Sequence, residues 1–148
     1  MKNLFLKKLT IIIFSYNRQK YLIRTLKYWS NYDIKLLVLD GSSEKLEDPI
    51  LNNKNIKYIY DPRSLNDRLI SSIDYVDTEF TILGCDDEFY LPSALDSCIN
   101  FLTKNPSYSC CGGMTVGFKT LNGGNEILGF EQYPKLRNFC LDNNNVTK

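Results

Sequence analysis

The sequence predicts a three-layer α/β sandwich: a mostly parallel β-sheet between helices, followed by a C-terminal β-hairpin. Short runs of β-branched and other apolar residues recur along the chain and are typical of strands buried on both faces. Segments with apolar residues at helical spacing lie between most of these runs. Polar turn residues follow each run. Strands that alternate with helices favour a parallel sheet with right-handed crossovers.

The first strand and helix come from residues 9–29. Residues 9–14 read Leu-Thr-Ile-Ile-Ile-Phe, which suits a central strand. Leu22, Leu26 and Trp29 then fall at i, i+4 and i+7, the stripe of an amphipathic helix. The polar segment 31–33 predicts the end of that helix.

The next elements extend the same alternation. Residues 34–39 predict a second buried strand, which ends in the turn sequence Asp-Gly-Ser-Ser, and residues 56–60 predict a weaker third strand. A helix should begin at Leu65, because Leu69, Ile73 and Val76 continue at helical spacing. The apolar run 80–83 predicts a fourth buried strand.

A third helix and a hairpin complete the predicted fold. Pro92 suits the first turn of a helix whose apolar face is formed by Leu95, Cys98, Ile99 and Leu102. Beyond it, alternating apolar residues at 114–118 and 127–130 flank Asn-Gly-Gly-Asn at 122–125, the pattern of a β-hairpin. Residues 142–148 are polar, and we expect a frayed tail. We expect one domain over residues 1–148, with its core at about 9–120 and the hairpin and tail at 121–148.

Composition excludes several classes of protein. The net charge is +1, with no dense Lys/Arg run, so nucleic acid is not an expected partner. The chain has five cysteines without CxxC spacing and no histidine, which argues against structural zinc and predicts free, buried thiols in the cytoplasm. No segment approaches the roughly 20 apolar residues of a membrane span, so any membrane association should be peripheral.

The candidate site lies where the parallel strands end, because ligands of open α/β sheets bind outside the carboxyl ends of the strands. The first strand is followed by an aromatic turn, the second by an isolated carboxylate, the third by an arginine and the fourth by an acidic cluster. These strand ends are Ser15-Tyr16-Asn17-Arg18, Asp40-Gly41-Ser42, Asp61-Pro62-Arg63 and Cys85-Asp86-Asp87-Glu88.

Together these residue types suit a nucleotide diphosphate. Clustered carboxylates commonly hold Mg²⁺ or Mn²⁺, which bridges them to substrate phosphates. Tyr16 could stack on a base, Asp40 could accept from a base N–H or a ribose hydroxyl, and Asp87 could hold the metal. Arg63 or Arg68 could neutralise phosphate charge.

Three motifs also resemble, in order, the GT-A glycosyltransferases of family 2, whose sheet is Rossmann-like. They are Thr10-Ile-Ile-Ile-Phe-Ser-Tyr-Asn-Arg18, Leu37-Val-Leu-Asp-Gly-Ser-Ser43 and Cys85-Asp-Asp-Glu-Phe-Tyr-Leu-Pro92. The resemblance covers about residues 9–118. It implies a nucleotide-diphosphosugar donor, a Mn²⁺ or Mg²⁺ cofactor, and inverting transfer to a hydroxyl of a carbohydrate or another acceptor.

Site roles follow from the matched motifs. The resemblance implies that Tyr16 packs against the nucleobase, that Asp40 contacts the base, that Asp86 lies near the ribose or the metal, and that Asp87 coordinates the metal. The sequence departs from the family pattern in two places: Leu39-Asp40 stands where paired acids are frequent, and Cys85 takes the first position of the usual Asp-x-Asp.

The catalytic base is not identified by the sequence. In such enzymes the second half of the domain supplies the acceptor site and the carboxylate base, and we expect this chain to contain mainly the donor-binding N-terminal part. Glu126, Glu131 and Asp142 are available carboxylates, but the sequence places none of them beside an acceptor.

Simpler interpretations remain open for each motif. Asp40-Gly41-Ser42 is also a common turn, and Asp86 to Glu88 could be solvated acids before a helix, an interpretation that suits Glu88 best. Tyr16 could be a packed ring at the edge of the core, Arg63 and Arg68 could be solvated surface cations, and the cysteines could be small core residues.

Two other functions also remain open. The chain could be a truncated or non-catalytic nucleotide-sugar-binding module. It could also be a receiver-like signalling domain, since these domains gather carboxylates and Mg²⁺ at strand ends too.

Overall fold

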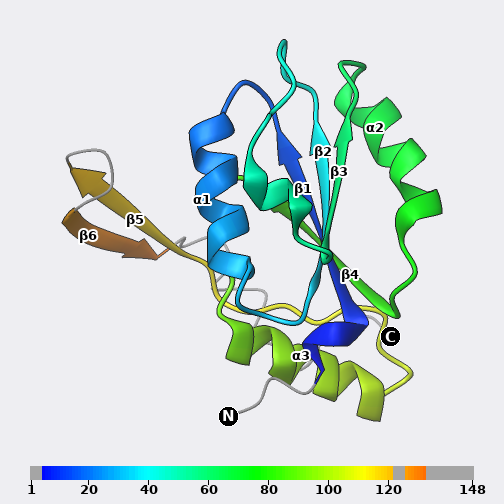
Figure 1. The fold of residues 1–148 in the computed structure, drawn as a ribbon. Helices are drawn as coiled ribbons and strands as arrows, with labels where there is room; N and C mark the ends of the chain where they lie inside the picture. Colours follow the sequence, from blue (N-terminus) through cyan, green and yellow to red (C-terminus); the bar gives the residue numbers. More distant parts are fainter. Residues whose placement is uncertain (1–4, 122–125, 133–148) are drawn as a thin grey trace. The chain divides into compact units, whose positions relative to one another are not determined.

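The computed structural model describes residues 5–121 and 126–132. The chain divides into two compact units, Met1–Asn100 and Phe101–Lys148, and each is described here by itself. The first unit contains the sheet, the helices around it and the candidate site (Figure 1). The second unit contains the end of the third helix and a hairpin.

A four-stranded parallel sheet forms the centre of the first unit, in the order β3-β2-β1-β4 (Figure 1). The predicted strands are all present. Their bounds are Leu9–Ser15 for β1, Lys35–Asp40 for β2, Ile56–Tyr60 for β3 and Phe80–Cys85 for β4. The order 3-2-1-4 is that of Rossmann-type sheets, whereas receiver-like domains have the order 2-1-3-4-5. The receiver-like interpretation is therefore wrong.

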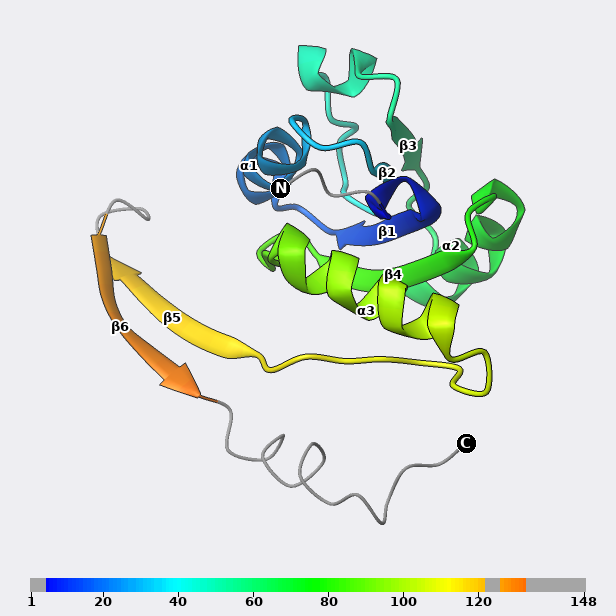
Figure 2. The same cartoon turned by 90° about the horizontal axis from the view of Figure 1, so that it is seen from below.

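Among the described residues, three α-helices and three short 3₁₀ turns accompany the sheet. Figure 1 shows α1 and α2 on opposite sides of it, as a three-layer sandwich requires. In both views the first 3₁₀ turn lies beside α3 (Figure 2), where the amide of Phe5 donates to Asp96 Oδ1 at 2.8 Å. The helices are α1 Gln19–Trp29, α2 Leu65–Ser72 and α3 Pro92–Lys104, and the 3₁₀ turns are η1 Leu6–Lys8, η2 Pro49–Asn52 and η3 Ile73–Tyr75.

The core has a large and a small part because the side chains of β1 and β2 alternate between the two faces of the sheet. Ile11 and Ile13 point to the larger part, where the predicted stripe of α1 is fully buried. Leu95 and Ile99 of α3 belong to the same part. The smaller part, on the opposite face, consists of Ile12, Leu37 and Leu39 with Phe14, Ile59 and Val76 packed against them.

Strand β4 differs from its prediction. Its sequence predicts a strand buried on both faces, but β4 is an edge strand in the described part of the chain, and Leu83 is 52% exposed. One face of β4 packs into the larger core through Phe80 and Ile82. The side chains on its other face, among them Leu83, are not part of the small cluster and are exposed to solvent. An apolar run of this length does not distinguish an edge strand from a central one.

Helix α2 also differs from its prediction. The helix ends at Ser72, and η3 replaces its predicted last turn. Ile73, expected on the buried stripe, is exposed, while the buried residues of α2 are Arg68 and Ser72. The packed face of this short helix is thus polar, because it meets the carbonyl ends of the sheet strands.

The second unit contains the predicted hairpin. Strand β5, Val116–Leu121, pairs antiparallel with β6, Glu126–Gln132, and the register shifts between Lys119 and Thr120. The predicted turn at 122–125 and the tail at 142–148 lie outside the described residues.

The prediction that the thiols are mostly buried is wrong for the residues that the structure describes. Cys85, Cys110 and Cys111 are exposed, and Cys98 is only half-buried. Cys85 lies at the end of the edge strand β4, and Cys110 and Cys111 lie between α3 and β5. Of the helices that the structure describes, none has the length and apolar character needed to cross a membrane.

Candidate functional site

The carboxyl ends of β1 and β4 form the centre of the candidate site. The chain winds from β1 through β2 to β3 on one side, and then returns to place β4 on the other side of β1. Such a switch point leaves a crevice at the carboxyl ends of the two adjoining strands, where open α/β sheets bind ligands. Ser15 ends β1, and Asp86 directly follows β4.

Asp86 is buried at this switch point and held from two sides. Its Oδ2 accepts a hydrogen bond of 2.9 Å from Ser15 Oγ, and its backbone carbonyl accepts one of 2.6 Å from Thr25 Oγ1 of α1. Burial raises the pKa of the Asp86 carboxyl, and the Ser15 hydrogen bond and the Arg18 charge oppose this rise. Asp86 is thus a positioned carboxylate with one oxygen, Oδ1, not used by Ser15.

Arg18 pairs with both carboxylates of the acidic cluster. Its Nη2 donates to Asp87 Oδ2 at 2.7 Å, and its Nε lies 3.4 Å from Asp86 Oδ1. The side chains of Arg18 and Asp87 are each 42% exposed, so this pair lies on the rim of the site. The hydrogen bond to Asp87 is the main cause that raises the pKa of Arg18. The guanidinium also lies over the ring of Tyr21, 4.5 Å from its centroid.

Asp40 is fully buried, and both of its oxygens are used inside the protein. Oδ1 accepts from the amide and the hydroxyl of Ser42, and Oδ2 accepts from the Tyr58 hydroxyl at 2.7 Å. Burial first, and then the hydrogen bond to Asp40, raise the pKa of the Tyr58 hydroxyl. The carboxylate thus holds the turn after β2, as the simpler interpretation expected, and a base could reach it only by displacing Tyr58 or Ser42.

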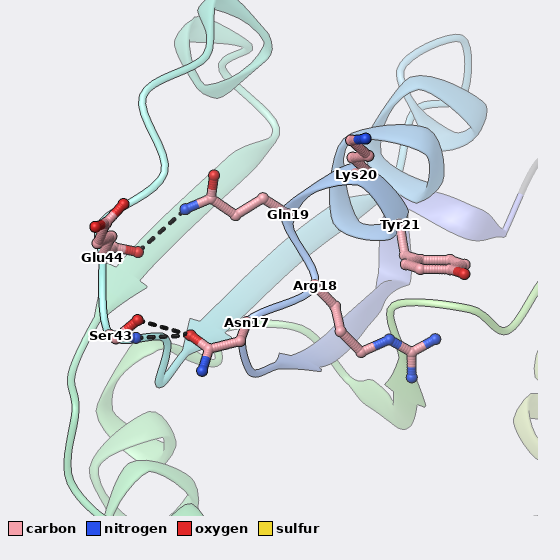
Figure 3. Close-up of a pocket in the computed structure, with 7 residues that line it drawn as sticks. All are labelled: Asn17, Arg18, Gln19, Lys20, Tyr21, Ser43 and Glu44. Atoms are coloured by element: carbon pink, nitrogen blue, oxygen red, sulfur yellow. Dashed lines mark hydrogen bonds between the residues drawn. The ribbon is translucent and has the colours of Figure 1, made fainter.

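Asn17 links the ends of β1 and β2. Its amide N–H donates to Ser42 Oγ at 2.7 Å, and its side-chain Oδ1 accepts from the amide of Ser43 at 2.8 Å and from the Ser43 hydroxyl at 3.1 Å (Figure 3). Asn17 has a positive φ of 54°, a conformation that asparagine tolerates better than most residues. Next to it, Tyr16 is 64% exposed on the rim, so it is not a packed core ring.

The two arginines proposed for phosphate have different positions. Arg63 is exposed, as expected for a surface cation, and pairs with Asp61, whose pKa it lowers mainly through its hydrogen bonds. Arg68 is only 6% exposed, so its interpretation as a solvated cation is wrong. Arg68 Nη1 donates to the carbonyls of Leu39 at 2.6 Å and Ser15 at 3.3 Å. These hydrogen bonds hold the guanidinium against the carboxyl ends of β1 and β2.

Glu88 and Cys85 shape the turn after β4. Glu88 Oε2 accepts from the amide of Cys85 at 3.1 Å and from the hydroxyl of Tyr90 at 3.0 Å, so Glu88 stabilises the turn, as its simpler interpretation predicted. Partial desolvation, followed by the charge of Glu88, raises the pKa of the Cys85 thiol. Cys85 therefore stays a neutral thiol more readily than an ordinary cysteine.

The acidic pair has the chemistry of a cation site. In the described part of the chain, no three His, Cys, Asp or Glu side chains are grouped to enclose a metal ion. Mg²⁺ sites that act on phosphates usually need only one or two carboxylates, because the substrate phosphates supply further ligands. Asp86 and Asp87 already gather one positive group, Arg18, through oxygens that face the rim. These residues fit a divalent cation shared with a phosphorylated ligand.

A pocket of about 560 Å³ lies beside this pair, between the start of α1 and the turn after β2 (Figure 3). Its size is within the range of small-molecule sites. Arg18 connects the pocket to the acidic pair. The pocket is lined by Asn17, Arg18, Gln19, Lys20, Tyr21, Ser43 and Glu44.

Sequence reasoning missed five of these lining residues, and a simple signal could have found them. Gln19, Lys20 and Tyr21 directly continue the strand end that finishes at Arg18, and Ser43 and Glu44 continue the one that finishes at Ser42. Gln19 Nε2 bridges the two segments by donating to the Glu44 carbonyl at 3.2 Å. Extending each strand end by three residues would have included all five.

The predicted residues therefore form two linked groups and one separate pair. Ser15, Arg18, Asp86 and Asp87 are in direct contact at the β1/β4 switch point. Asn17 connects to Asp40 through Ser42. Arg68 lies beneath both groups through its bond to the Ser15 carbonyl, while Arg63 is paired locally with Asp61.

Comparison with known proteins gives one clear match. A family model described as glycosyl transferase family 2 matches residues 10–147, nearly the whole chain. Among curated proteins, no significant match was found.

Proposed function

The chain belongs to glycosyl transferase family 2, and we propose that it binds a nucleotide-diphosphosugar and transfers the sugar to a hydroxyl of a carbohydrate or another acceptor. Family membership supports glycosyl transfer in general. The observation that carries the more specific proposal is the acidic pair Asp86 and Asp87 at the switch point, joined through Arg18 to a pocket at the start of α1.

The pocket suits the diphosphate of a donor. Arg18 and Lys20 supply positive charge at the N-terminal end of α1, and the free N–H groups and dipole at a helix N-terminus favour anions. Tyr16 offers an exposed ring on which a nucleobase could stack. Asp40 and Arg68 would act indirectly by holding the ends of β1 and β2 in place, since both Asp40 oxygens and Arg68 Nη1 form hydrogen bonds within the protein.

The metal belongs to the proposal as well. Members of this family commonly use divalent metals, and we assign Mn²⁺ or Mg²⁺ to Asp87, with Asp86 beside it. When bound, the cation would stabilise negative charge on the departing diphosphate. Ser15 and Thr25 would keep Asp86 oriented toward the rim, and Arg18 and Lys20 would hold the remaining phosphate charge.

Transfer would occur by direct displacement. The acceptor oxygen forms a bond to the anomeric carbon as the bond to the diphosphate oxygen breaks, which inverts the configuration at that carbon. The hydroxyl proton must pass to a carboxylate base, which stays unassigned. The side chains of Glu126 and Glu131, and all of Asp142, lie outside what the structure describes.

A second candidate function is a non-catalytic nucleotide-sugar-binding module. It is favoured by the carboxylates at the carboxyl ends of β2, β3 and β4, each of which has a partner within the protein: Asp40, Asp61, Asp86, Asp87 and Glu88. None of the five is left unpaired to act as a base. Release of free sugar from a donor, or its transfer to an acceptor, by the isolated chain would decide against this function.

Location is also part of the proposal. We propose a cytoplasmic protein whose contact with any membrane-bound acceptor is peripheral. The free thiols of Cys85, Cys98 and Cys110 support a reducing compartment.

Isothermal titration with UDP, GDP and TDP, with and without Mn²⁺, tests the proposal. We expect one nucleotide to bind, more tightly with Mn²⁺, and Asp87→Ala to lose the effect of the metal. Asp77→Ala is a matched control, because Asp77 is also exposed and paired but lies at the amino end of the sheet, bound to Lys35. Binding of Asp87→Ala equal to that of Asp77→Ala would contradict the proposed metal site.

A further inference from the structure

Arg18 contacts carboxylate oxygens of Asp86 and Asp87 that a metal ion could use. Asp86 Oδ2 is taken by Ser15, and the rim-facing oxygens, Asp86 Oδ1 and Asp87 Oδ2, both face the Arg18 guanidinium. We propose that Arg18 and the divalent cation compete for this acidic pair, so that Arg18 acts as a latch that keeps the metal site closed until a donor binds. This inference rests on the proposed function.

Distance and charge oppose simultaneous occupancy of the oxygen that Arg18 already binds, Asp87 Oδ2. A divalent cation binds carboxylate oxygen at about 2.0–2.2 Å, and Nη2 of Arg18 already lies 2.7 Å from Asp87 Oδ2. Both cations would then share one oxygen at close range, with like charges facing each other. The guanidinium must therefore leave Asp87 Oδ2 when the metal binds that oxygen.

Arg18 can leave without disturbing the core. Its side chain is partly exposed, and its guanidinium already contacts the ring of Tyr21. That ring is itself partly exposed and offers a cation–π contact that does not depend on the acids. The hydrogen bonds that fix Asp86, from Ser15 and Thr25, do not involve Arg18.

A released Arg18 would face the donor, because the same side chain lines the pocket (Figure 3). A nucleotide diphosphate would therefore act twice: its phosphates complete the ligands of the metal, and their charge attracts the displaced guanidinium. The latch makes the bare protein a poor metal binder and couples metal binding to the arrival of the donor.

Mn²⁺ titration without nucleotide, followed by the electron paramagnetic resonance signal of free Mn²⁺, tests the latch. We expect Arg18→Gln to bind Mn²⁺ about fivefold more tightly than the wild type, the upper end for loss of an exposed ion pair. Arg18→Lys, which keeps the charge, should bind as weakly as the wild type. Arg24→Gln is the matched control: Arg24 also stacks on Tyr21, and it has no ion pair with Asp86 or Asp87 in the described residues.

A second measurement follows the guanidinium itself. Mg²⁺ added to ¹⁵N-labelled protein should shift the Nε–H resonance of Arg18 and leave that of Arg24 in place. If Arg18→Gln binds Mn²⁺ no more tightly than Arg24→Gln, while Asp87→Ala loses Mn²⁺, the latch is refuted and the proposed metal site stands. If no variant binds Mn²⁺, with or without UDP, the metal site and the latch are both refuted.

Discussion

A methyl group on Gly41 would collide with the buried guanidinium of Arg68, and Gly41→Ala should therefore destabilise the fold. A Cβ at Gly41 would lie 2.5 Å from Arg68 Cζ, 2.6 Å from Nη2 and 2.8 Å from Nη1. Carbon atoms in contact are normally about 3.5–4.0 Å apart. The backbone of Gly41 cannot yield easily, because its amide donates to the Ser15 carbonyl at 3.0 Å. Arg68 must move instead.

The cost follows from the hydrogen bonds that Arg68 would lose. Nη1 holds the carbonyls of Leu39 and Ser15, and a hydrogen bond from a charged group contributes about 1.5–3 kcal/mol. The substitution also restricts the unfolded chain, which returns about 0.4–1 kcal/mol. If one hydrogen bond is lost, the free energy of unfolding should fall by about 0.5–2.6 kcal/mol.

Urea unfolding followed by circular dichroism measures this loss. Gly112→Ala is the matched control, because nothing lies within 4 Å of a Cβ at Gly112, and its stability should stay within about 0.5 kcal/mol of the wild type. In an Arg68→Ala background the clash is gone, and Gly41→Ala should then cost nothing. An equal loss in both backgrounds would refute the reasoning, since the two residues would not interact.

Substitutions at three further positions probe the strand ends. Tyr58→Phe removes the hydroxyl that binds Asp40 and the amide of Leu46. With these buried groups left unpaired, the free energy of unfolding measured in urea should fall by about 1–3 kcal/mol. An unchanged unfolding midpoint would disprove this role. Asn17→Ala and Asn17→Gly both lose the side-chain amide, but only alanine resists the φ of 54°. The alanine variant should therefore be less stable by about 1 kcal/mol, and equal stabilities would argue against strain at this position. Asp86 is protonated more easily when folded, because burial raises its pKa above the ordinary 3.8. Between the ordinary pKa of Asp86 in the unfolded chain and its higher pKa in the folded protein, the folded state binds more protons than the unfolded state. Stability therefore falls as pH rises through this interval. As the pH is raised from about 3 to about 7, the free energy of unfolding of Asp86→Asn should increase relative to that of the wild type. A difference that does not change with pH would contradict the burial effect.

Local sequence patterns predicted the elements of the sheet well, because the strands β1 and β2 are buried on both faces and leave uninterrupted apolar runs. The same pattern failed for β4. A short, mostly apolar run looks alike at the edge and at the centre of a sheet, and only the strand order placed Leu83 at an open face.

The residues that follow each strand were predicted, but their partners were not. Arg68 has no local signal for burial, since long cations are mostly exposed and its acceptors are carbonyls of two distant strands. Asp40 and Asp87 both lie at the carboxyl ends of strands, yet Asp40 is fully buried and Asp87 lies on the rim. This difference depends on Tyr58, a residue of the neighbouring strand whose hydroxyl reaches Asp40.

The pairing of Arg18 with the acidic cluster was likewise absent from the sequence pattern. Arg18 and Asp87 are 69 residues apart, and they meet only because β1 and β4 are neighbours. The sequence therefore supplied the list of residues at the sheet edge, and the strand order supplied their pairings.

The central claim is that the acidic pair at the β1/β4 switch point holds a cation together with a nucleotide diphosphate. Anomalous diffraction at the manganese edge, from crystals grown with UDP and Mn²⁺, tests it most directly. The account predicts one strong peak within about 2.2 Å of an Asp87 carboxylate oxygen, with the Arg18 guanidinium moved off that oxygen. A manganese peak bound elsewhere, with Arg18 still paired to Asp87, would contradict it.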